Sequence, residues 1–327
     1  MGRVAAGVAF RMPSVVTATA YGGPEVLTVT DQAAAGPLGP GEARVAVRAA
    51  GVNPIDWKAY SGQFGTNPAA LPMRLGAEAA GTVTEVGPGT AGPAGPLRPG
   101  DDVIAYRASG AYAAELVLPG SALVPKPAAL DWAQAACLMV TGVTAWHVLA
   151  ATGVRAGDTV LLNGASGGVG TIAVQLAVAR GATVLATASP ARHDFLRGLG
   201  AIPVAYGPGL AGRVRAAAPG GVTAAADLIG TDEAIDVSLE LVADRARIAT
   251  IAGFGRGFAE KIKVLGGAPG ADPGTQIRDA ARLELTRLAA DGAVRVSVAA
   301  AYPLTAVADA HRASMTGHAG GKLALIV

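Results

Sequence analysis

The sequence predicts an α/β protein of two domains, one rich in β-strands and one built on a doubly wound parallel sheet. Three observations support this. The chain has 327 residues, which exceeds the usual size of one domain. Its first part consists of short strand-like segments separated by turns, and from about residue 128 apolar strand-like runs alternate with helical ones. We expect residues 14–127 and 266–327 to form the β-rich domain and residues 128–265 the parallel-sheet domain.

Short strands dominate the first part of the chain. Turn sequences such as GGPE, GPLGPGE and LRPGD separate them. Several alternate apolar and polar residues, as half-buried antiparallel strands do. The predicted strands lie within residues 14–21, 26–30, 43–52, 80–87, 101–106 and 113–119. This part of the chain therefore predicts a β-barrel or a sandwich.

The second part has the order strand, helix, strand, which is typical of a parallel sheet with helices on both faces. The predicted strands lie within residues 159–163, 183–187, 202–206, 225–230 and 246–253. The predicted helices between them lie within residues 168–180, 189–200, 209–217 and 231–244. Beyond residue 265 we expect a long helix within 277–292, a helix at 304–316 and a last strand at 322–327 that returns to the first domain.

Composition excludes several classes of protein. Charged residues make up 15% of the chain and its formal net charge is +2, so nothing indicates a nucleic-acid groove or a polybasic membrane anchor. The single cysteine, Cys137, excludes an intrachain disulfide and favours a reducing, cytoplasmic compartment. Polar residues or glycines interrupt the uncharged stretches 132–154 and 159–179, so a buried α/β core explains them better than a membrane span. Residues 1–13 predict a tail rather than a secretory signal.

The sequence NGASGGVG, residues 163–170, follows a predicted strand and opens a predicted helix. In this context a glycine cluster indicates a dinucleotide site. Aligned with the fingerprint G-x-G-x-x-G, the cluster has Ala165 in place of the first glycine. Gly167 would let the diphosphate approach the backbone, and Gly170 would let helix and strand pack closely. A tight turn without a ligand is the alternative.

The end of the next predicted strand favours NADPH over NADH. An NAD site usually has Asp or Glu there to bind the ribose 2′-hydroxyl. Here the residues are Thr187, Ala188 and Ser189, followed by Arg192, with no carboxylate before Asp194. A hydroxyl and a guanidinium bind a 2′-phosphate by charge-assisted hydrogen bonds. The same residues also make a helix N-cap, which is compatible with an anion site.

Several segments in fixed order resemble one protein family. They are AYGGPEVLTV, AAGVNPIDWKAYSG, LGAEAAGTVTEVG, LMVTGVTAWHVL, NGASGGVGTIAVQLAVARGATVLATAS and GKLALIV. They are similar to the quinone oxidoreductase branch of the medium-chain dehydrogenase/reductase superfamily, also called zeta-crystallin-like. The resemblance implies a GroES-like catalytic domain, split in sequence around a Rossmann domain, with the active site in the cleft between them.

Many members of that superfamily are zinc alcohol dehydrogenases, but the zinc ligands are missing here. The active-site histidine of those enzymes corresponds to Ala77, and their first cysteine ligand falls near Asn53. Cys137 is displaced by about three residues from the third ligand region, and we expect it to be a small buried residue. Because a catalytic zinc needs three protein ligands, we expect no metal.

The resemblance also implies residue roles. Asn53 would lie beside the nicotinamide and the substrate, and Lys58 and Tyr60 match substrate-facing positions more loosely. Asn53 followed by Pro54 is equally typical of a turn, and the alternative for Tyr206 is a strand-end aromatic. His193 is a candidate neighbour of the 2′-phosphate. The predicted cofactor-binding residues are Thr141, Thr144, Ser166, Gly167, Gly168, Val169, Gly170, Ser189, Arg192, Tyr206, Ile251 and Gly253.

A site without a metal suits hydride delivery to a carbon that is already electrophilic. We therefore expect an NADPH-dependent, zinc-independent oxidoreductase that reduces a quinone or an activated alkene. The alternatives are an enoyl reductase of a biosynthetic pathway and a nonenzymatic NADPH-binding protein, crystallin-like or redox-sensing. We expect no nucleic-acid or membrane partner. The resemblance implies a homodimer paired through a strand near the sequence KIKVLG.

Overall fold

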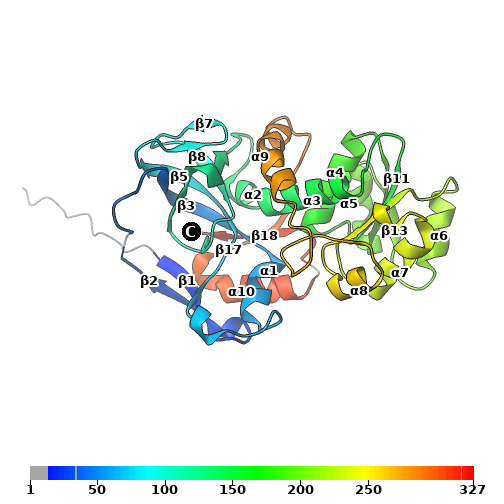
Figure 1. Ribbon diagram of the computed structural model, residues 1–327, viewed down its shortest axis with the longest axis horizontal. Helices are drawn as coiled ribbons and strands as arrows, with labels where there is room; N and C mark the ends of the chain where they lie inside the picture. The colour runs from blue at the N-terminus through cyan, green and yellow to red at the C-terminus, as the bar shows by residue number, and fades with distance from the viewer. Residues whose placement is uncertain (1–13, 34, 318) are drawn as a thin grey trace, which may run out of the picture.

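The computed structural model describes residues 14–33, 35–317 and 319–327. The predicted tail, residues 1–13, lies outside the described residues. Two domains lie side by side, and the β-rich domain contains both the first and the last strands of the chain (Figure 1). This arrangement confirms the predicted α/β fold of a β-rich domain and a parallel-sheet domain.

The second domain contains a six-stranded sheet in which every pair is parallel, in the order β13-β12-β11-β14-β15-β16. Counted along the chain from β11, this is the order 3-2-1-4-5-6 of the Rossmann fold. The strands are β11 (Thr159–Asn163), β12 (Thr183–Ala188), β13 (Ile202–Ala205), β14 (Ala224–Asp227), β15 (Ile248–Thr250) and β16 (Lys263–Val264).

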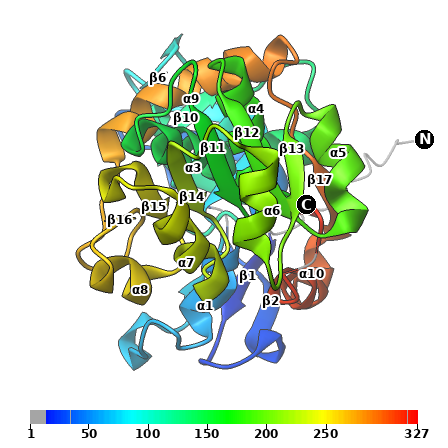
Figure 2. The same cartoon turned by 90° about the vertical axis from the view of Figure 1, so that its right-hand side faces the viewer.

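Helices cover both faces of this sheet because successive residues of its strands are apolar (Figure 2). Val160 and Leu162 of β11 belong to one core, together with α3 and α4, whereas Leu161 packs with α6 and α7. The helices are α3 (Met139–Ala151), α4 (Gly168–Ala179), α5 (His193–Gly198), α6 (Leu210–Ala217), α7 (Asp232–Leu241) and α8 (Phe254–Ala259).

The β-rich domain has two main sheets that share one core. One has the order β10-β8-β5-β3-β18-β17 with β9 also paired to β3, and the other has the order β2-β1-β4. The strands are β1 (Ser14–Ala18), β2 (Leu27–Asp31), β3 (Glu42–Val52), β4 (Met73–Arg74), β5 (Glu78–Val86), β8 (Asp102–Tyr106), β9 (Glu115–Pro119), β10 (Leu123–Pro125), β17 (Val298–Pro303) and β18 (Lys322–Ile326). A short hairpin, β6 (Ala91–Gly92) and β7 (Gly95–Pro96), stands apart.

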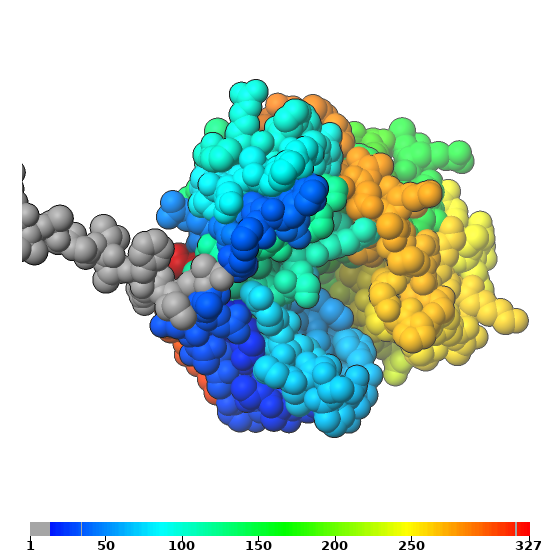
Figure 3. All heavy atoms as spheres, turned by 60° about the vertical axis from the view of Figure 1, so that its left-hand side comes forward, coloured from blue at the N-terminus to red at the C-terminus, as the bar shows by residue number. Residues whose placement is uncertain are grey.

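The last strand, β18, pairs antiparallel with β3, so the chain returns to its first domain as predicted. The remaining helices are α1 (Pro54–Tyr60), α2 (Trp132–Ala136), α9 (Thr275–Ala290) and α10 (Val307–Met315). α2 packs on β3 and β5 although it follows residue 128, and α9 packs on α3 although it follows residue 265. In Figure 3 the orange residues, which include α9, run along the boundary between the two domains.

Candidate functional site

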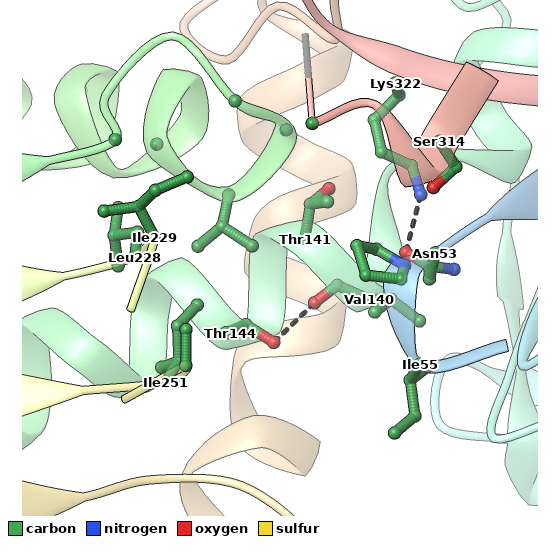
Figure 4. Close-up of a pocket in the computed structure, with 18 of the residues that line it drawn as sticks. Asn53, Ile55, Val140, Thr141, Thr144, Leu228, Ile229, Ile251, Ser314 and Lys322 are labelled. Atoms are coloured by element: carbon green, nitrogen blue, oxygen red, sulfur yellow. Dashed lines mark hydrogen bonds between the residues drawn. The ribbon is translucent and has the colours of Figure 1, made fainter. Parts of the chain in front are cut away.

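A pocket of about 550 Å³ opens between the two domains. The parallel-sheet domain lines it with the glycine loop and with the segments that follow β14 and β15, so it lies at the carboxyl ends of the strands. The β-rich domain contributes the start of α1 and the segment before β18. Figure 4 shows these side chains converging on one space.

The glycine loop combines a tight turn, an open backbone and a close helix–strand contact. A Cβ atom at Gly170 would lie 2.5 Å from the oxygen of Gly164, so helix and strand pack there as predicted. A Cβ atom at Gly167 would meet only that oxygen, at 3.5 Å, so this backbone is open. The tight turn itself is made by Gly164, whose φ is +77°. The fingerprint G-x-G-x-x-G put Ala165 at the position of its first glycine, whereas the chain turns at Gly164. The three glycines Gly164, Gly167 and Gly170 are therefore spaced by three residues.

Buried polar side chains hold the loop in place. The Thr187 hydroxyl donates to Asn163 Oδ1 at 3.2 Å and accepts from the Gly164 N–H at 3.1 Å. Asp227 accepts from the Gly230 N–H at 2.7 Å and from the Thr250 hydroxyl at 2.6 Å, which fixes the ends of β14 and β15. These hydrogen bonds tie the ends of β11, β12, β14 and β15 to one another and to the loops that follow them.

Asn53 sits in a buried network on the opposite wall (Figure 4). Lys322 Nζ donates to Asn53 Oδ1 and to the Val52 carbonyl, each at 2.6 Å, and lies 3.2 Å from Glu78 Oε1. Asn53 Nδ2 donates to that same carboxylate at 3.1 Å, and Glu78 Oε2 accepts from the Val140 N–H at 2.8 Å. All the polar atoms of Asn53 and Lys322 therefore have partners, so these residues position the site.

Helix α1 places Lys58 and Tyr60 on different sides. Two residues correspond to about 200° of rotation on an α-helix. Lys58 lines the pocket with Ile55, whereas Tyr60 is fully buried and bonds His311 Nδ1 at 2.8 Å. The structure therefore does not bring Tyr60 to the pocket, because helical periodicity turns it into the core.

The core side of α1 contains a chain of hydrogen bonds. Asp56 Oδ2 accepts from the Asn53 N–H at 2.8 Å and from the Tyr112 hydroxyl at 2.7 Å. Burial raises the pKa of Asp56 to about 6 and lowers the pKa of His311 to about 4. His311 Nε2 lies 3.3 Å from the Tyr112 oxygen. A neutral His311 therefore accepts from Tyr60 at Nδ1 and donates to Tyr112 at Nε2.

Thr141 and Thr144 line the pocket from α3 (Figure 4). Their hydroxyls donate to the carbonyls of Cys137 at 2.8 Å and Val140 at 2.7 Å. Thr144 also accepts a hydrogen bond from Arg278 at 3.3 Å. Cys137 itself is fully buried, as predicted, and burial raises the pKa of its thiol to about 12.

Some of the other predicted cofactor-binding residues line the pocket and others do not. Gly168, Val169 and Ile251 line it with Gly167 and Gly170. Ser166, Ser189, Arg192, Tyr206 and Gly253 are not among its lining residues. Arg192 is nevertheless close, since its guanidinium donates to the carbonyl of the lining residue Gly320 at 2.7 Å and lies 4.2 Å from the Phe195 ring.

The end of β12 has no carboxylate directed at the site among the described residues. Asp194, the first one that follows, is 98% exposed and pairs with Arg197. His193 lies 3.3 Å from the Ala188 carbonyl through Nε2. Tyr206 is 55% exposed.

Sequence reasoning missed three residues of the site. Lys322 belongs to the quoted segment GKLALIV and Glu78 to LGAEAAG, but neither was considered for a role. Arg278 lies inside the predicted helix after residue 265. For Lys322 and Glu78, the available signal of a functional role was a charged side chain within a mostly apolar segment.

The charged side chains that line the pocket are cations, of which Lys322 is paired with the buried Glu78. Among the described residues that line it there are three cations, Lys58, Arg278 and Lys322, and no carboxylate. Where the structure describes the chain, no group of three His, Cys, Asp or Glu side chains is placed to bind a metal ion. Across the same residues, no helix is long and apolar enough to cross a membrane.

Two families match parts of the chain. Residues 39–128 match the alcohol dehydrogenase GroES-like domain, which agrees with the predicted GroES-like fold of this part of the chain. Residues 199–325 match the family described as zinc-binding dehydrogenase.

Curated relatives include synthases and a reductase. The spectinabilin polyketide synthase system protein NorB of Streptomyces orinoci is 40% identical over 253 residues, which are 76% of this chain and 10% of that protein. A quinone oxidoreductase of Pseudomonas aeruginosa is 42% identical over 187 residues, 56% of this chain and 55% of that protein. The chain therefore spans a tenth of the first relative and about half of the second.

Solved structures match over nearly the whole chain. An NAD-dependent alcohol dehydrogenase has a TM-score of 0.83 and 31% identity, with 96% of this chain and 99% of that chain covered. A mycobacterial protein complexed with NADPH has a TM-score of 0.82 and 30% identity, covering 96% and 100%. A quinone oxidoreductase of Pseudomonas syringae pv. tomato has a TM-score of 0.81 and 30% identity, covering 97% and 100%.

Proposed function

Because the chain belongs to the quinone oxidoreductase branch of the medium-chain dehydrogenase/reductase superfamily, we propose that it is an NADPH-dependent oxidoreductase. Its substrate is a quinone or an activated alkene, and no zinc takes part. The observation that carries the proposal is a single cationic pocket that extends from the open backbone of Gly167 to Asn53 and Lys58.

The residues present fit a phosphorylated dinucleotide. The first N–H groups of α4 have no partners within the helix and point toward the loop, where a diphosphate would bind. Thr141 and Thr144 would flank the nicotinamide, with Ile251 on the far wall. When bound, NADPH supplies the hydride. Ser189 and Arg192 would hold the 2′-phosphate, with Tyr206 near the adenosine.

Lys58 is the residue that meets the substrate oxygen. Reduction of a quinone or an enone develops negative charge on oxygen, which a fixed donor stabilises. Lys322 Nζ already has three oxygen partners, two in hydrogen bonds and one in an ion pair, and Tyr60 lies in the core. Lys58 lines the pocket, its ammonium lies 5.5 Å from the Trp57 ring centroid, and no described residue accepts a hydrogen bond from it.

Two alternatives remain open to test. An enoyl reductase of a biosynthetic pathway is supported by the polyketide synthase relative, whose sequence contains a matching segment. A nonenzymatic NADPH-binding protein would keep the same pocket. A homodimer paired through β16 is part of the proposal, because β16 is an edge strand of its sheet.

The experiment is a binding titration followed by a turnover assay. Purified protein is titrated with NADPH and NADH by nucleotide fluorescence, and NADPH oxidation is then measured with a panel of quinones and enones. Turnover supports an enzyme, whereas tight NADPH binding without any turnover favours the nonenzymatic alternative. Lys58→Met should lower kcat without changing NADPH affinity. Lys126→Met is the matched control, because Lys126 also lies over a tryptophan, 4.7 Å from the Trp132 ring centroid, but outside the pocket.

A further inference from the structure

Arg278 presents a cation to the pocket without a direct carboxylate partner. Its guanidinium donates through Nε to His147 Nδ1 and through one terminal nitrogen to Thr144 Oγ1, both at 3.3 Å. Neither acceptor carries a negative charge, and no ion pair of Arg278 exists within the described residues, although the Asp272 carboxylate beyond His147 lies near enough to interact with its charge. The second terminal nitrogen, Nη2, has no hydrogen-bond partner among those residues. The cation therefore has donors left for a ligand.

A buried support fixes the direction of this guanidinium. His147 is fully buried, and burial lowers its pKa, so the ring is neutral at pH 7. Arg278 can only donate, so Nδ1 is the acceptor and Nε2 carries the proton toward Asp272 Oδ2, at 3.1 Å. Gly274 passes directly over the ring, because a Cβ atom there would lie 2.3 Å from it. His147, Asp272 and Gly274 thus hold the Arg278 side chain in one orientation.

The position of Arg278 opposes the helix dipole. It is the fourth residue of α9, whose first turn contains no acidic residue. A cation near a helix N-terminus is electrostatically unfavourable. The charge of Arg278 therefore does not stabilise α9, which indicates a role for this side chain outside the helix.

Arg278 reaches the pocket at Thr144, apart from the glycine loop where the diphosphate would bind. A Cβ atom at Gly168 would lie 3.1 Å from Thr141 Cγ2, so Thr141 borders the glycine loop. Thr144, which Arg278 contacts, lies three residues further along α3, about 4.5 Å away along the axis. Figure 4 shows Thr144 displaced from Thr141 toward Ile251, and the faint orange helix α9 beside α3.

We infer that Arg278 selects a substrate that carries an oxyanion, either a carboxylate or a phosphate, in addition to its reducible double bond. This inference rests on the proposed function. Three apolar residues that line the pocket, Ile55, Phe64 and Ile229, are each about half exposed. The substrate is therefore amphiphilic, with an apolar body between Lys58, at the reacting oxygen, and Arg278, at the anionic group.

The test uses three matched enones: benzylideneacetone, its para-carboxylate and its para-phosphate. The expected result is a kcat/KM at least 10-fold higher for one or both anionic enones than for the neutral enone. The better anionic probe identifies the group. Arg278→Gln should raise the KM for that enone about 10-fold and bring the ratio of kcat/KM for the anionic enone to kcat/KM for the neutral enone close to one. Arg278→Lys should restore part of the preference.

Arg287→Gln is the matched control, because Arg287 lies on the same helix, outside the pocket, and pairs with Glu284 and Asp291. Equal kcat/KM values for neutral and anionic enones in the wild-type protein would overturn the inference. So would an Arg278→Gln variant that loses NADPH affinity or loses activity equally with every enone.

A binding measurement separates this inference from the proposed function. The saturated probe 4-(4-carboxyphenyl)butan-2-one is titrated by calorimetry into the NADPH complex of the wild-type and Arg278→Gln proteins. Binding that depends on Arg278, without turnover of any enone, would contradict the proposed function and support the inference. Turnover of enones, with equal probe binding by both proteins, would support the proposed function and contradict the inference.

Discussion

The substitution Gly167→Ala tests whether a diphosphate lies on the glycine loop. Gly167 has φ of −77° and ψ of 174°, which alanine adopts without strain. The added Cβ atom would meet only the Gly164 oxygen, at 3.5 Å, an ordinary contact. Alanine is a poorer N-cap than glycine, at a cost of about 1 kcal/mol, and lower entropy of the unfolded chain offsets about 0.4–1 kcal/mol. The free energy of unfolding should therefore change by less than about 1 kcal/mol.

The ligand, in contrast, would meet the new methyl group. A diphosphate in contact with the loop backbone must move outward, and we expect NADPH affinity to fall at least about 10-fold, or ~1.4 kcal/mol. Fluorescence titration measures the affinity, and urea denaturation of the protein without ligand measures the stability.

Gly170→Ala is the matched control, because this substitution should lower the stability of the protein more than Gly167→Ala does. Its Cβ atom would lie 2.5 Å from the Gly164 oxygen and 2.6 Å from Ala165 Cα, so α4 has to shift. Overpacking of this kind costs about 1–3 kcal/mol of stability. If Gly167→Ala binds NADPH as tightly as the wild-type protein does, the diphosphate does not lie on this loop and the assignment is refuted.

Three further predictions concern the cofactor phosphate, the metal and the buried histidine. Arg192→Ala should weaken NADPH binding much more than NADH binding, and an unchanged ratio of the two affinities would refute the 2′-phosphate assignment. Treatment with a zinc chelator should leave activity intact, so loss of activity that added zinc restores would overturn the metal-free mechanism. His311 has a folded pKa of about 4, below its ordinary 6.5, so the stability it contributes is lost as the pH falls from about 6.5 toward 4. His311→Gln lacks this loss, so its deficit in unfolding free energy relative to the wild-type protein should shrink by about 3 kcal/mol between pH 7 and pH 4, as measured by urea denaturation. A difference in unfolding free energy that stays constant with pH would contradict the buried neutral state of His311. Asp56, whose pKa is raised, titrates in both proteins, so its contribution cancels in this difference.

Periodicity along the chain was sufficient to predict most of the fold. Strands such as Thr159–Asn163 are apolar on successive residues, because helices cover both faces of the sheet. The return of the last strand to the first domain was expected from the strand-like run at 322–327, and the structure pairs this strand, β18, with β3. Domain limits were harder to place, because α2 and α9 pack across the boundary between the domains.

The site was predicted only in part, because its central contacts join residues far apart in sequence. Lys322 meets Asn53 across 269 positions, and no local pattern encodes that pair. Tyr60 was assigned to the substrate, like Lys58, because the family resemblance implies a substrate-facing residue at both positions. Helical phase separates the two, and a count of 100° per residue would have shown it. Gly164 was overlooked because a fixed motif was applied, whereas only the φ of +77° identifies the residue that turns.

Hydride transfer itself is the most direct test of the account. NADPH carrying deuterium at C4 of the nicotinamide is incubated with the protein and benzylideneacetone, and the product is analysed by mass spectrometry and NMR. The account predicts one deuterium at the β-carbon of the saturated ketone, delivered from one face of the nicotinamide. A protein that binds NADPH yet yields no deuterated product from this or any other enone, and oxidises no NADPH with quinones, would contradict it.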